Sequence, residues 1–305
     1  MRIGVDLGGT KTEAIAIAAD GQTLARRRLP TPKGDYPGTI EGIAILVDGL
    51  VAAFAETHGT PAGIGVGIPG AVSPATGLIK NANSTWLIGK PFDRDLEARL
   101  GRPVRLANDA DCLALSEASD GAAAGRPTVF AAILGTGVGG GLTVHGHLVT
   151  GPNAIAGEWG HNPLPWPVPD ELPGPTCYCG KTGCIETWLS GPGFASDQER
   201  ATGTFMQAEE IVAAALAGDA TAAECLERYC DRLARALASV INIFDPHAIV
   251  LGGGLSNVAA VYERVPALWD RYCFSDTVVT PLLKSQHGDS SGVRGAAWLW
   301  PENAR

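Results

Sequence analysis

The chain has 305 residues, of which 45% are apolar and 18% charged, and its formal net charge is −9. This length exceeds the usual size of a single hydrophobic core, so we expect two globular domains. The acidic balance excludes a fold-wide basic surface and argues against nucleic acid as a partner. The opening segment MRIGVDLGG lacks the features of a signal peptide, and apolar runs such as VFAAIL at 129–134 are too short to span a bilayer. We therefore expect a cytoplasmic protein with no membrane partner.

The first part of the chain alternates between predicted strands and helices. Apolar segments at 3–7, 12–18 and 22–30 predict three strands joined by tight turns. Apolar residues spaced three and four apart over 40–54 predict a helix. Segments 62–70 and 104–109 predict two further strands. The polar, turn-rich segment 73–91 between them is expected to be a surface loop.

From Thr128 the pattern restarts with a strand that breaks into glycines and a hairpin partner at 141–149. The segment 151–176 is rich in proline and glycine, and a loop of that length is usually functional or held in place by another group. Residues 207–243 predict long helical structure that stops at Asp245-Pro246. A strand at 248–252 and a helix at 291–300 follow. We predict an N-terminal α/β domain over 1–120, completed by a C-terminal helix at 290–305, and a second α/β domain over 121–289.

The segment DLGGTK at 6–11 is a candidate phosphate-binding hairpin. The backbone N–H groups of Gly8, Gly9 and Thr10 can point at a phosphate, and Lys11 adds a positive charge. Asp6 ends the first strand and could hold Mg²⁺ through water. The alternative is an ordinary glycine hairpin.

Two later glycine clusters repeat this design. In LGTGVGGG at 134–141, the backbone amides of Thr136 and Gly137 and the Thr136 hydroxyl could bind a second part of a phosphate tail. LGGGLS at 251–256 has glycines against which a flat adenine could lie, at Gly252, Gly253 and Gly254. A tight strand-to-helix turn explains the last cluster nearly as well.

LANDAD at 106–111 places Asp109 at the end of a strand and before a helical run. A carboxylate there can accept a proton from a substrate hydroxyl. Asn and Asp also favour the helix N-cap, so either Asn108 or Asp109 could cap the helix while the other serves in chemistry.

Carboxylates and amides bind polyhydroxyl sugars because they accept and donate hydrogen bonds in pairs. GEWGH at 157–161 and GCIET at 183–187 supply Glu158 and Glu186, and Asn83 and Asn108 supply amides. A single exposed Glu is more often a solvated surface charge. The neighbouring glycines and cysteines favour a site here.

CYCGKTGC at 177–184 contains three of the seven cysteines. An odd number of cysteines in a chain of this kind argues against a disulfide framework. With His161, the thiolates of Cys177, Cys179 and Cys184 make a closed tetrahedral Cys3His set for a structural zinc. The alternative is a group of reduced, buried cysteines.

Taken in order, DLGGTK, LANDAD, ILGTGVGGG, GEWGH, CYCGKTGCIE and VLGGG resemble the ROK family of bacterial sugar kinases and repressors. The resemblance implies an actin-like ATPase fold: two RNase H-like domains with a cleft between them. It implies phosphoryl transfer from MgATP to a hexose. The resemblance to this family also implies a homodimer. The helix-turn-helix of the family's repressors does not precede the first glycine motif, so a sugar-sensing regulator is the less favoured reading.

Within the family, KNANSTW, GHNPLPW and HGDSSGVRGAAWLW resemble the fructokinase branch. This implies transfer of the ATP γ-phosphate to the 6-hydroxyl of D-fructose. Glucose, mannose, N-acetylglucosamine and N-acetylmannosamine remain alternatives, because motifs shared by the family do not define the pocket. We expect N-acetylated sugars to be poor substrates, since a pocket must make room for that group.

The resemblance also assigns roles to individual residues. Asp109 matches the catalytic base, and His161 matches both a metal ligand and a neighbour of the sugar. The other matches are to sugar (Asn83, Asn108, Glu158, Glu186), to phosphates and Mg²⁺ (Asp6, Gly8, Gly9, Thr10, Lys11, Thr136, Gly137), to adenosine (Gly252, Gly253, Gly254) and to zinc (Cys177, Cys179, Cys184).

Overall fold

The structure, a computed structural model, describes residues 1–82 and 84–300. The chain forms two compact units. Unit 1 comprises Met1–Gly125, Gly141–Ala156 and the described chain from Gln286 onward, and unit 2 comprises Arg126–Gly140 and Gly157–Ser285. The segment 141–156, which we placed in the second domain, lies in unit 1, so neither unit is one continuous stretch of chain.

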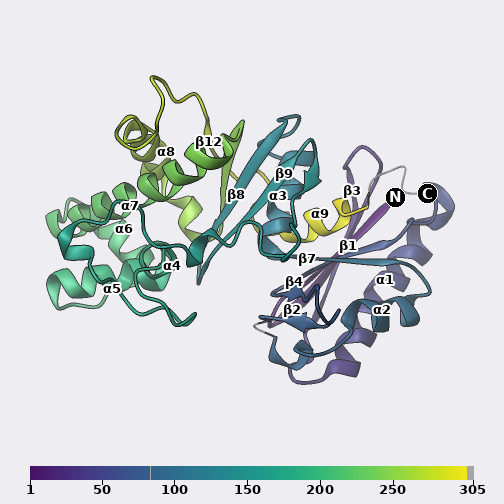
Figure 1. Ribbon diagram of the computed structural model, residues 1–305. Coiled ribbons are helices and arrows are strands. Elements are labelled where there is room, and N and C mark those ends of the chain that lie inside the picture. Colours follow the sequence, from purple (N-terminus) through teal and green to yellow (C-terminus); the bar gives the residue numbers. More distant parts are fainter. Residues whose placement is uncertain (83, 301–305) are drawn as a thin grey trace. The chain divides into compact units, whose positions relative to one another are not determined.

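Unit 1 is built on a five-stranded sheet with the order β3-β2-β1-β4-β7 (Figure 1). Strands β1, β2 and β3 are antiparallel neighbours, whereas β1, β4 and β7 run parallel. A two-stranded hairpin of β5 and β6 follows β4. The strands are β1 (Arg2–Leu7), β2 (Lys11–Ile17), β3 (Thr23–Pro30), β4 (Ile64–Ile68), β5 (Ala71–Val72), β6 (Ile79–Lys80) and β7 (Val104–Asn108).

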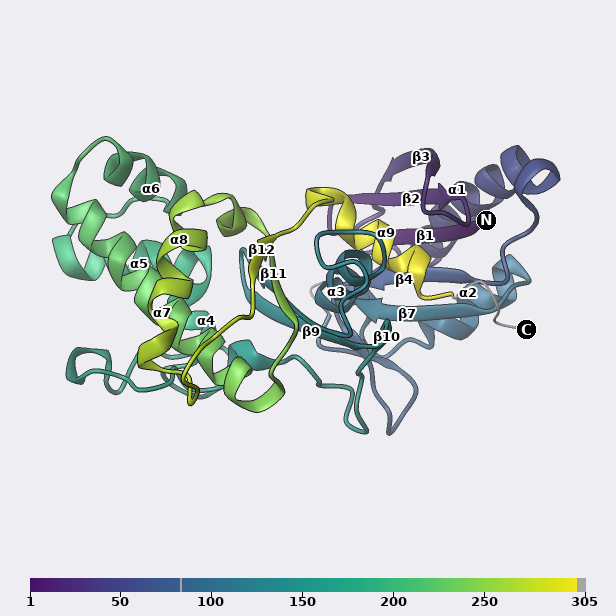
Figure 2. The same ribbon diagram turned by 90° about the horizontal axis from the view of Figure 1, so that it is seen from above.

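Helices cover both faces of this sheet. Helices α1 (Tyr36–His58) and α2 (Phe92–Leu100) pack on one face, and α3 (Asp109–Ser119) and α9 (Ser291–Trp298) lie on the other, as the two views in Figures 1 and 2 show. Gly4 and Gly65 make this packing possible. A Cβ at Gly4 would lie 2.2 Å from the Val293 carbonyl oxygen, and one at Gly65 would lie 1.7 Å from that of Ala296. The two glycines therefore let the C-terminal helix lie directly on the first and fourth strands.

Helix α1 is long and apolar enough, by length and composition alone, to cross a membrane. Our sequence reading found no such segment. Its buried face, formed by Ile43, Leu46, Val47 and Leu50, is part of the hydrophobic core of unit 1. Packing of a core helix therefore accounts for its apolar character.

The segment 73–91 differs from the surface loop that we predicted. It contains strand β6 and a short 3-10 helix, η1 (Thr85–Leu87), and it buries the side chains of Ile79, Ala82 and Leu87. Helix α2 follows it and was not predicted. Five charged residues in FDRDLEARL obscure its apolar face, which consists of Phe92 and Leu96.

The second sheet has the order β10-β9-β8-β11-β12. Strands β8, β11 and β12 are parallel, and β9 and β10 are antiparallel neighbours. Its strands are β8 (Thr128–Leu134), β9 (Val138–Val144), β10 (His147–Leu148), β11 (Ala248–Gly252) and β12 (Leu282–Lys284). The helices of unit 2 are α4 (Glu186–Leu189), α5 (Gly191–Thr202), α6 (Ala208–Leu216), α7 (Ala220–Phe244) and α8 (Ala259–Ala267). Short 3-10 helices complete the described chain: η2 (Trp159–His161), η3 (Pro169–Glu171), η4 (Gly254–Asn257), η5 (Trp269–Arg271) and η6 (Gly288–Ser290).

The predicted helical segment 207–243 is two helices. Gly218 adopts a positive φ of 93° after α6, and the side chain of Asp219 then caps α7 by accepting a hydrogen bond from the Ala222 N–H. The predicted stop is confirmed, because α7 ends at Phe244 and Asp245 takes a left-handed conformation before Pro246.

Candidate active site and metal centre

The first glycine hairpin joins β1 to β2 in unit 1. The Gly8 N–H donates to the carbonyl of Lys11 over 3.0 Å, so this amide closes the turn. The Gly8 carbonyl accepts from the Thr31 hydroxyl, which fixes the hairpin from the side of β3. Gly9, Thr10 and Lys11 are exposed, and a Cβ at Gly9 would meet no protein atom within 4 Å. The tip of the hairpin is therefore the part that a phosphate could approach.

Asp6 stands directly opposite Glu13 in the register of β1 and β2. The pKa of Asp6 is raised to about 6, chiefly by burial. The charges of Asp109 and Glu13 also raise this pKa, and those of Lys11 and Arg26 lower it by less. A cation placed beside Asp6 would relieve this concentration of negative charge. The acidic environment therefore suits the Mg²⁺ role that the sequence suggested for Asp6.

The sequence LANDAD left open whether Asn108 or Asp109 caps the following helix, and the structure answers this question. The Asn108 side chain caps α3 by accepting from the Asp111 N–H over 2.6 Å. Asp109 is the first residue of that helix, is exposed, and accepts from the Ala110 N–H over 2.9 Å. Crowding by surrounding protein atoms raises its pKa, an effect that the backbone hydrogen bonds partly offset. A carboxylate with these properties can act as a general base.

Asn83, the remaining residue that we assigned to sugar binding in this half of the chain, lies outside the described residues.

A cavity of about 180 Å³ opens in unit 1 next to Asn108. It lies over the ends of β4 and β7, and its walls come from the β5–β6 hairpin and from the segment 150–156. Sequence reasoning did not find this cavity, because its lining residues are far apart in the chain.

The second glycine hairpin, between β8 and β9, is held by Glu186. The Glu186 carboxylate accepts from the Val138 N–H over 2.9 Å. A Cβ at Gly137 would lie 2.7 Å from the same carboxylate, so a larger residue at this position would displace the Glu186 side chain. Thr136, at the tip, is exposed.

Glu158 is exposed and immediately precedes η2. The Trp159 indole anchors this turn by donating to the Gly139 carbonyl over 2.8 Å and by packing edge-on against Phe130. Glu158 is thus presented from a fixed backbone.

The third glycine cluster has a packing reason of its own. Gly253 has φ 82°, and a Cβ there would lie 2.4 Å from the Leu134 carbonyl oxygen. Gly252 ends β11 and Gly254 begins η4. The strand-to-helix turn that we considered is present at the position assigned to adenosine.

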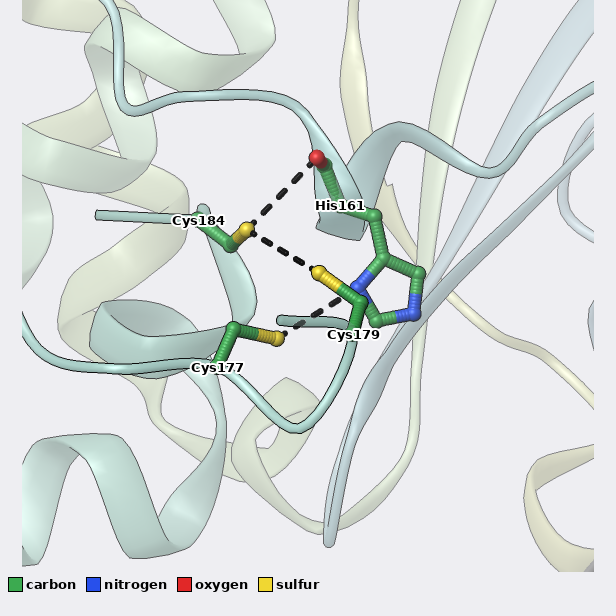
Figure 3. Close-up of side chains that lie close together, drawn as sticks. All are labelled: His161, Cys177, Cys179 and Cys184. Atoms are coloured by element: carbon green, nitrogen blue, oxygen red, sulfur yellow. Dashed lines mark hydrogen bonds between the residues drawn. The ribbon is translucent and has the colours of Figure 1, made fainter. Parts of the chain in front are cut away.

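The structure brings His161, Cys177, Cys179 and Cys184 together (Figure 3). Their ligand atoms all lie within 4.8 Å of one another. The Cys177 Sγ is 3.6 Å from the His161 Nδ1, and the sulfurs of Cys179 and Cys184 are 3.7 Å apart. The latter distance is far beyond the roughly 2.05 Å of a disulfide.

These distances fit a tetrahedral metal site. With Zn–S bonds of about 2.3 Å and a Zn–N bond of about 2.0 Å, the ligand atoms of a tetrahedral site lie about 3.5–3.8 Å apart. Three thiols and one imidazole are also the donor set of a structural zinc site. The Tyr178 hydroxyl is 2.9 Å from the His161 Nε2, so both ring nitrogens have neighbours within the metal loop, residues 157–187.

The middle of the metal loop is held by a buried ion pair that sequence reasoning missed. Glu171 is bound by Arg235 through both carboxylate oxygens, at 2.7 and 2.8 Å, and by Arg232 at 2.7 Å. Arg235 also donates to the carbonyls of Pro165 and Trp166. Burial opposes ionisation of Glu171, but the arginine hydrogen bonds outweigh it and lower its pKa to about 2.

The chain matches the model of the ROK family over residues 2–303, and it belongs to this family. It is 41% identical to an N-acetyl-D-glucosamine kinase of Vibrio vulnificus over 303 residues, which are 98% of this chain and 99% of that protein.

Two solved structures are similar in sequence and in fold. A ROK hexokinase from Thermus thermophilus has a TM-score of 0.85 and 31% identity, covering 97% of this chain and 96% of that one. A ROK family glucokinase from Streptomyces griseus, in complex with glucose and AMPPNP, has a TM-score of 0.74 and 30% identity, covering 98% of both chains. The predicted actin-like ATPase fold is confirmed by this likeness.

Proposed function

We propose that this member of the ROK family is an ATP-dependent sugar kinase whose preferred substrate is N-acetyl-D-glucosamine. The observation that carries the sugar assignment is the 41% identity to the Vibrio vulnificus N-acetyl-D-glucosamine kinase over nearly the full length of both chains. The exposed Asp109 carboxylate, with its raised pKa, supports the kinase chemistry.

In the proposed reaction, Asp109 accepts the proton of the sugar 6-hydroxyl. The sugar oxygen forms a bond to the γ-phosphorus as the bond from that phosphorus to the bridging oxygen of ADP breaks. Phosphoryl transfer needs positioning and charge neutralisation more than covalent help from the protein. A base of raised pKa retains the proton better than an ordinary aspartate at the moment of transfer.

The nucleotide enters as MgATP. We assign Asp6 to the Mg²⁺ side, the tip of the first hairpin (Gly9, Thr10 and Lys11) and Thr136 to the phosphates, and the turn at Gly252, Gly253 and Gly254 to adenosine. The acidic surroundings of Asp6 support the first assignment. The involvement of Gly8 and Gly137 in packing and turn closure gives them an indirect role, because they shape the two hairpins.

For the sugar hydroxyls we propose Asn83, Asn108, Glu158 and Glu186. Asn108 uses its side-chain oxygen to cap α3, so its amide nitrogen is the group that can donate to a hydroxyl. His161 faces Cys177 with Nδ1 and Tyr178 with Nε2, which favours its role as a metal ligand over direct contact with the sugar.

We further propose that the Cys3His cluster holds a structural zinc ion. Zinc bound there would cross-link the two ends of the loop segment from His161 to Cys184, and a closed set of four protein ligands leaves no position for a substrate. The cluster would thereby hold Glu158, three residues before His161, and Glu186, two residues after Cys184.

The fructokinase prediction is not supported by these comparisons. It rested on three segments, of which one contains Asn83 and another, GHNPLPW at 160–166, is part of the metal loop. The relative reported above is an N-acetyl-D-glucosamine kinase, which favours one of our alternatives over D-fructose.

A coupled ADP-release assay tests the proposal. The purified protein should be supplied with N-acetylglucosamine, N-acetylmannosamine, glucose, mannose and fructose in turn. We expect the highest kcat/KM for N-acetylglucosamine, and a 6-phosphate product by phosphorus NMR. A higher kcat/KM for fructose would restore the fructokinase reading, and no turnover of any sugar would contradict the kinase assignment.

A further inference from the structure

The cavity beside Asn108 is formed entirely by residues of unit 1. Its floor is the end of the edge strand β7, where Leu106, Ala107 and Asn108 are all only half-buried. A cavity of about 180 Å³ is far larger than the voids that packed interiors usually leave. The half-buried end of β7 therefore faces a space large enough for a ligand group.

Two features hold the walls of this cavity in place. The Lys80 ammonium of the β5–β6 hairpin donates to the Asn153 carbonyl over 3.4 Å, which links one wall to the other. Ala154 adopts a left-handed conformation, with φ 50°, that is unfavourable for alanine. Strained residues of this kind cluster at ligand-binding positions, where the surrounding structure enforces them.

The lining is chemically uneven. Ala71, Val72, Ala107 and Ala154 present small apolar groups, Asn108 and Thr150 have side chains that can donate hydrogen bonds, and Asp111 adds a carboxylate. The cavity volume of about 180 Å³ is many times the roughly 10–15 Å³ that a single water molecule requires. An acetamido group needs this combination, because its methyl group favours apolar walls and its carbonyl requires a donor.

We propose that this cavity receives the acetamido group of the sugar and that Ala71, Val72 and Ala107 determine the preference for N-acetylated over unsubstituted hexoses. The inference rests on the proposed function and extends it by naming the residues that make the enzyme selective. It also explains how the chain meets the steric requirement that led us to expect poor use of N-acetylated sugars.

The first experiment fills the cavity. Ala71→Leu adds three carbon atoms to the wall of β5. The ratio of kcat/KM for N-acetylglucosamine to that for glucose should fall about 10- to 100-fold, in line with the selectivity of hydrophobic pockets for one or a few carbons. Ala25→Leu is the matched control, because Ala25 is also half-buried on an edge strand but lies outside the cavity. It should leave the ratio within about threefold of wild type, inside the range expected when no pocket contact changes.

The second experiment enlarges the cavity, so its result does not depend on whether the fold tolerates a larger side chain. Val72→Ala should raise kcat/KM for N-propanoylglucosamine relative to N-acetylglucosamine by about 10-fold, because the removed methyl groups make room for the longer acyl chain. Val51→Ala is the control, since Val51 and Val72 are both partly buried against the hydrophobic core of unit 1. Loss of activity through instability would appear in both valine variants.

The outcomes separate the two proposals. If wild-type protein prefers a sugar without an acetamido group, the proposed function fails. If it prefers N-acetylglucosamine but Ala71→Leu lowers kcat/KM for both sugars equally, or Val72→Ala leaves the acyl preference unchanged, the cavity does not hold the acetamido group and the inference is overturned.

Discussion

The carboxylate of Glu186 accepts a hydrogen bond from the backbone N–H of Val138 over 2.9 Å. This bond joins the end of the metal loop to the second glycine hairpin, two motifs that are about fifty residues apart in the sequence. Glu186 therefore has a structural partner besides the sugar hydroxyls that we assign to it. A change in the hairpin should reach the sugar through this residue.

Gly137→Ala tests that relationship. The new Cβ would lie 2.7 Å from the Glu186 carboxylate, so that side chain must move. Because the clash is with the end of a flexible side chain, the fold should tolerate the shift, but displacement of the carboxylate should raise KM for the sugar about 10-fold. Gly135→Ala, in the same hairpin, places its Cβ where no atom lies within 4 Å and should leave the sugar KM near the wild-type value. Equal sugar KM values for the two variants would contradict the argument.

Gly9→Ala tests the tip of the first hairpin. Its Cβ would touch no protein atom, so the fold should tolerate the change. A phosphate lying against the Gly9 amide would be obstructed, and KM for ATP should rise about 10-fold or more while the sugar KM stays nearly constant. The measurement is initial-rate kinetics with each substrate varied in turn.

Gly42→Ala is the matched control for Gly9→Ala. A Cβ at Gly42 also meets no atom within 4 Å, but this glycine lies in the middle of α1. It should leave both KM values unchanged and stabilise the helix by about 0.5–1 kcal/mol. If Gly9→Ala behaves like Gly42→Ala, the tip of the hairpin does not approach a phosphate.

The motifs that could be predicted from the sequence are those whose residues are close together in the chain. Three cysteines within eight residues define the metal loop, and each glycine cluster follows its own strand. Glu171 lies 61 and 64 residues before its arginine partners, and no local pattern marks that pairing. The cavity likewise combines Ala71, Ala107 and Ala154, which only the fold brings together. In our proposal the choice of sugar depends on such distant residues, which the shared motifs do not report.

Asp109→Asn keeps the shape of the side chain and removes its basicity. We expect kcat to fall about 10²- to 10⁴-fold, with a modest change in sugar affinity, because a positioned general base contributes rate enhancement of that order. Near wild-type turnover would rule out Asp109 as the base.

The pH profile gives an independent check on Asp109. Crowding by surrounding protein atoms raises the pKa of Asp109 above the ordinary value of 3.8, and a general base works only when it is deprotonated. The wild-type rate should therefore rise with pH along an acid limb whose midpoint lies above that value, and Asp109→Asn should lose this limb. The comparison needs kcat/KM measured over about pH 5 to 9, because kcat/KM reports the pKa of the general base in the free enzyme.

Cys179→Ser tests the metal cluster. Serine is a poor zinc ligand beside thiolates, so the zinc content per chain should fall well below the wild-type stoichiometry of one that we expect from elemental analysis. Sugar KM should rise more than ATP KM, because the loosened loop carries Glu158 and Glu186. Cys273→Ser, a buried cysteine outside the cluster, should retain the metal. Fully active wild-type protein without zinc would refute the assignment.

Glu171→Gln tests the second anchor of the metal loop. The substitution removes the carboxylate that Arg232 and Arg235 share, and it leaves Asp197 as the ion-pair partner of Arg232 and Asp231 as that of Arg235. Removal of one partner from a buried ion-pair network is strongly destabilising. We expect the free energy of unfolding at neutral pH to fall by about 3 kcal/mol in urea titrations. Glu41→Gln, which removes an exposed partner of Arg99, should have almost no effect.

The stability lost in Glu171→Gln should depend on pH in a defined direction. The pKa of Glu171 is lowered from 4.5 to about 2 in the folded protein, because the hydrogen bonds from Arg235 and Arg232 outweigh burial. A carboxylate with a depressed folded pKa stabilises the protein above its unfolded pKa, and this contribution disappears as pH falls through the folded value. The difference between wild type and Glu171→Gln should therefore be constant above about pH 5.5 and shrink steadily below about pH 4.5. A difference that does not change over this range would mean that Glu171 stabilises the loop through packing and not through its charge.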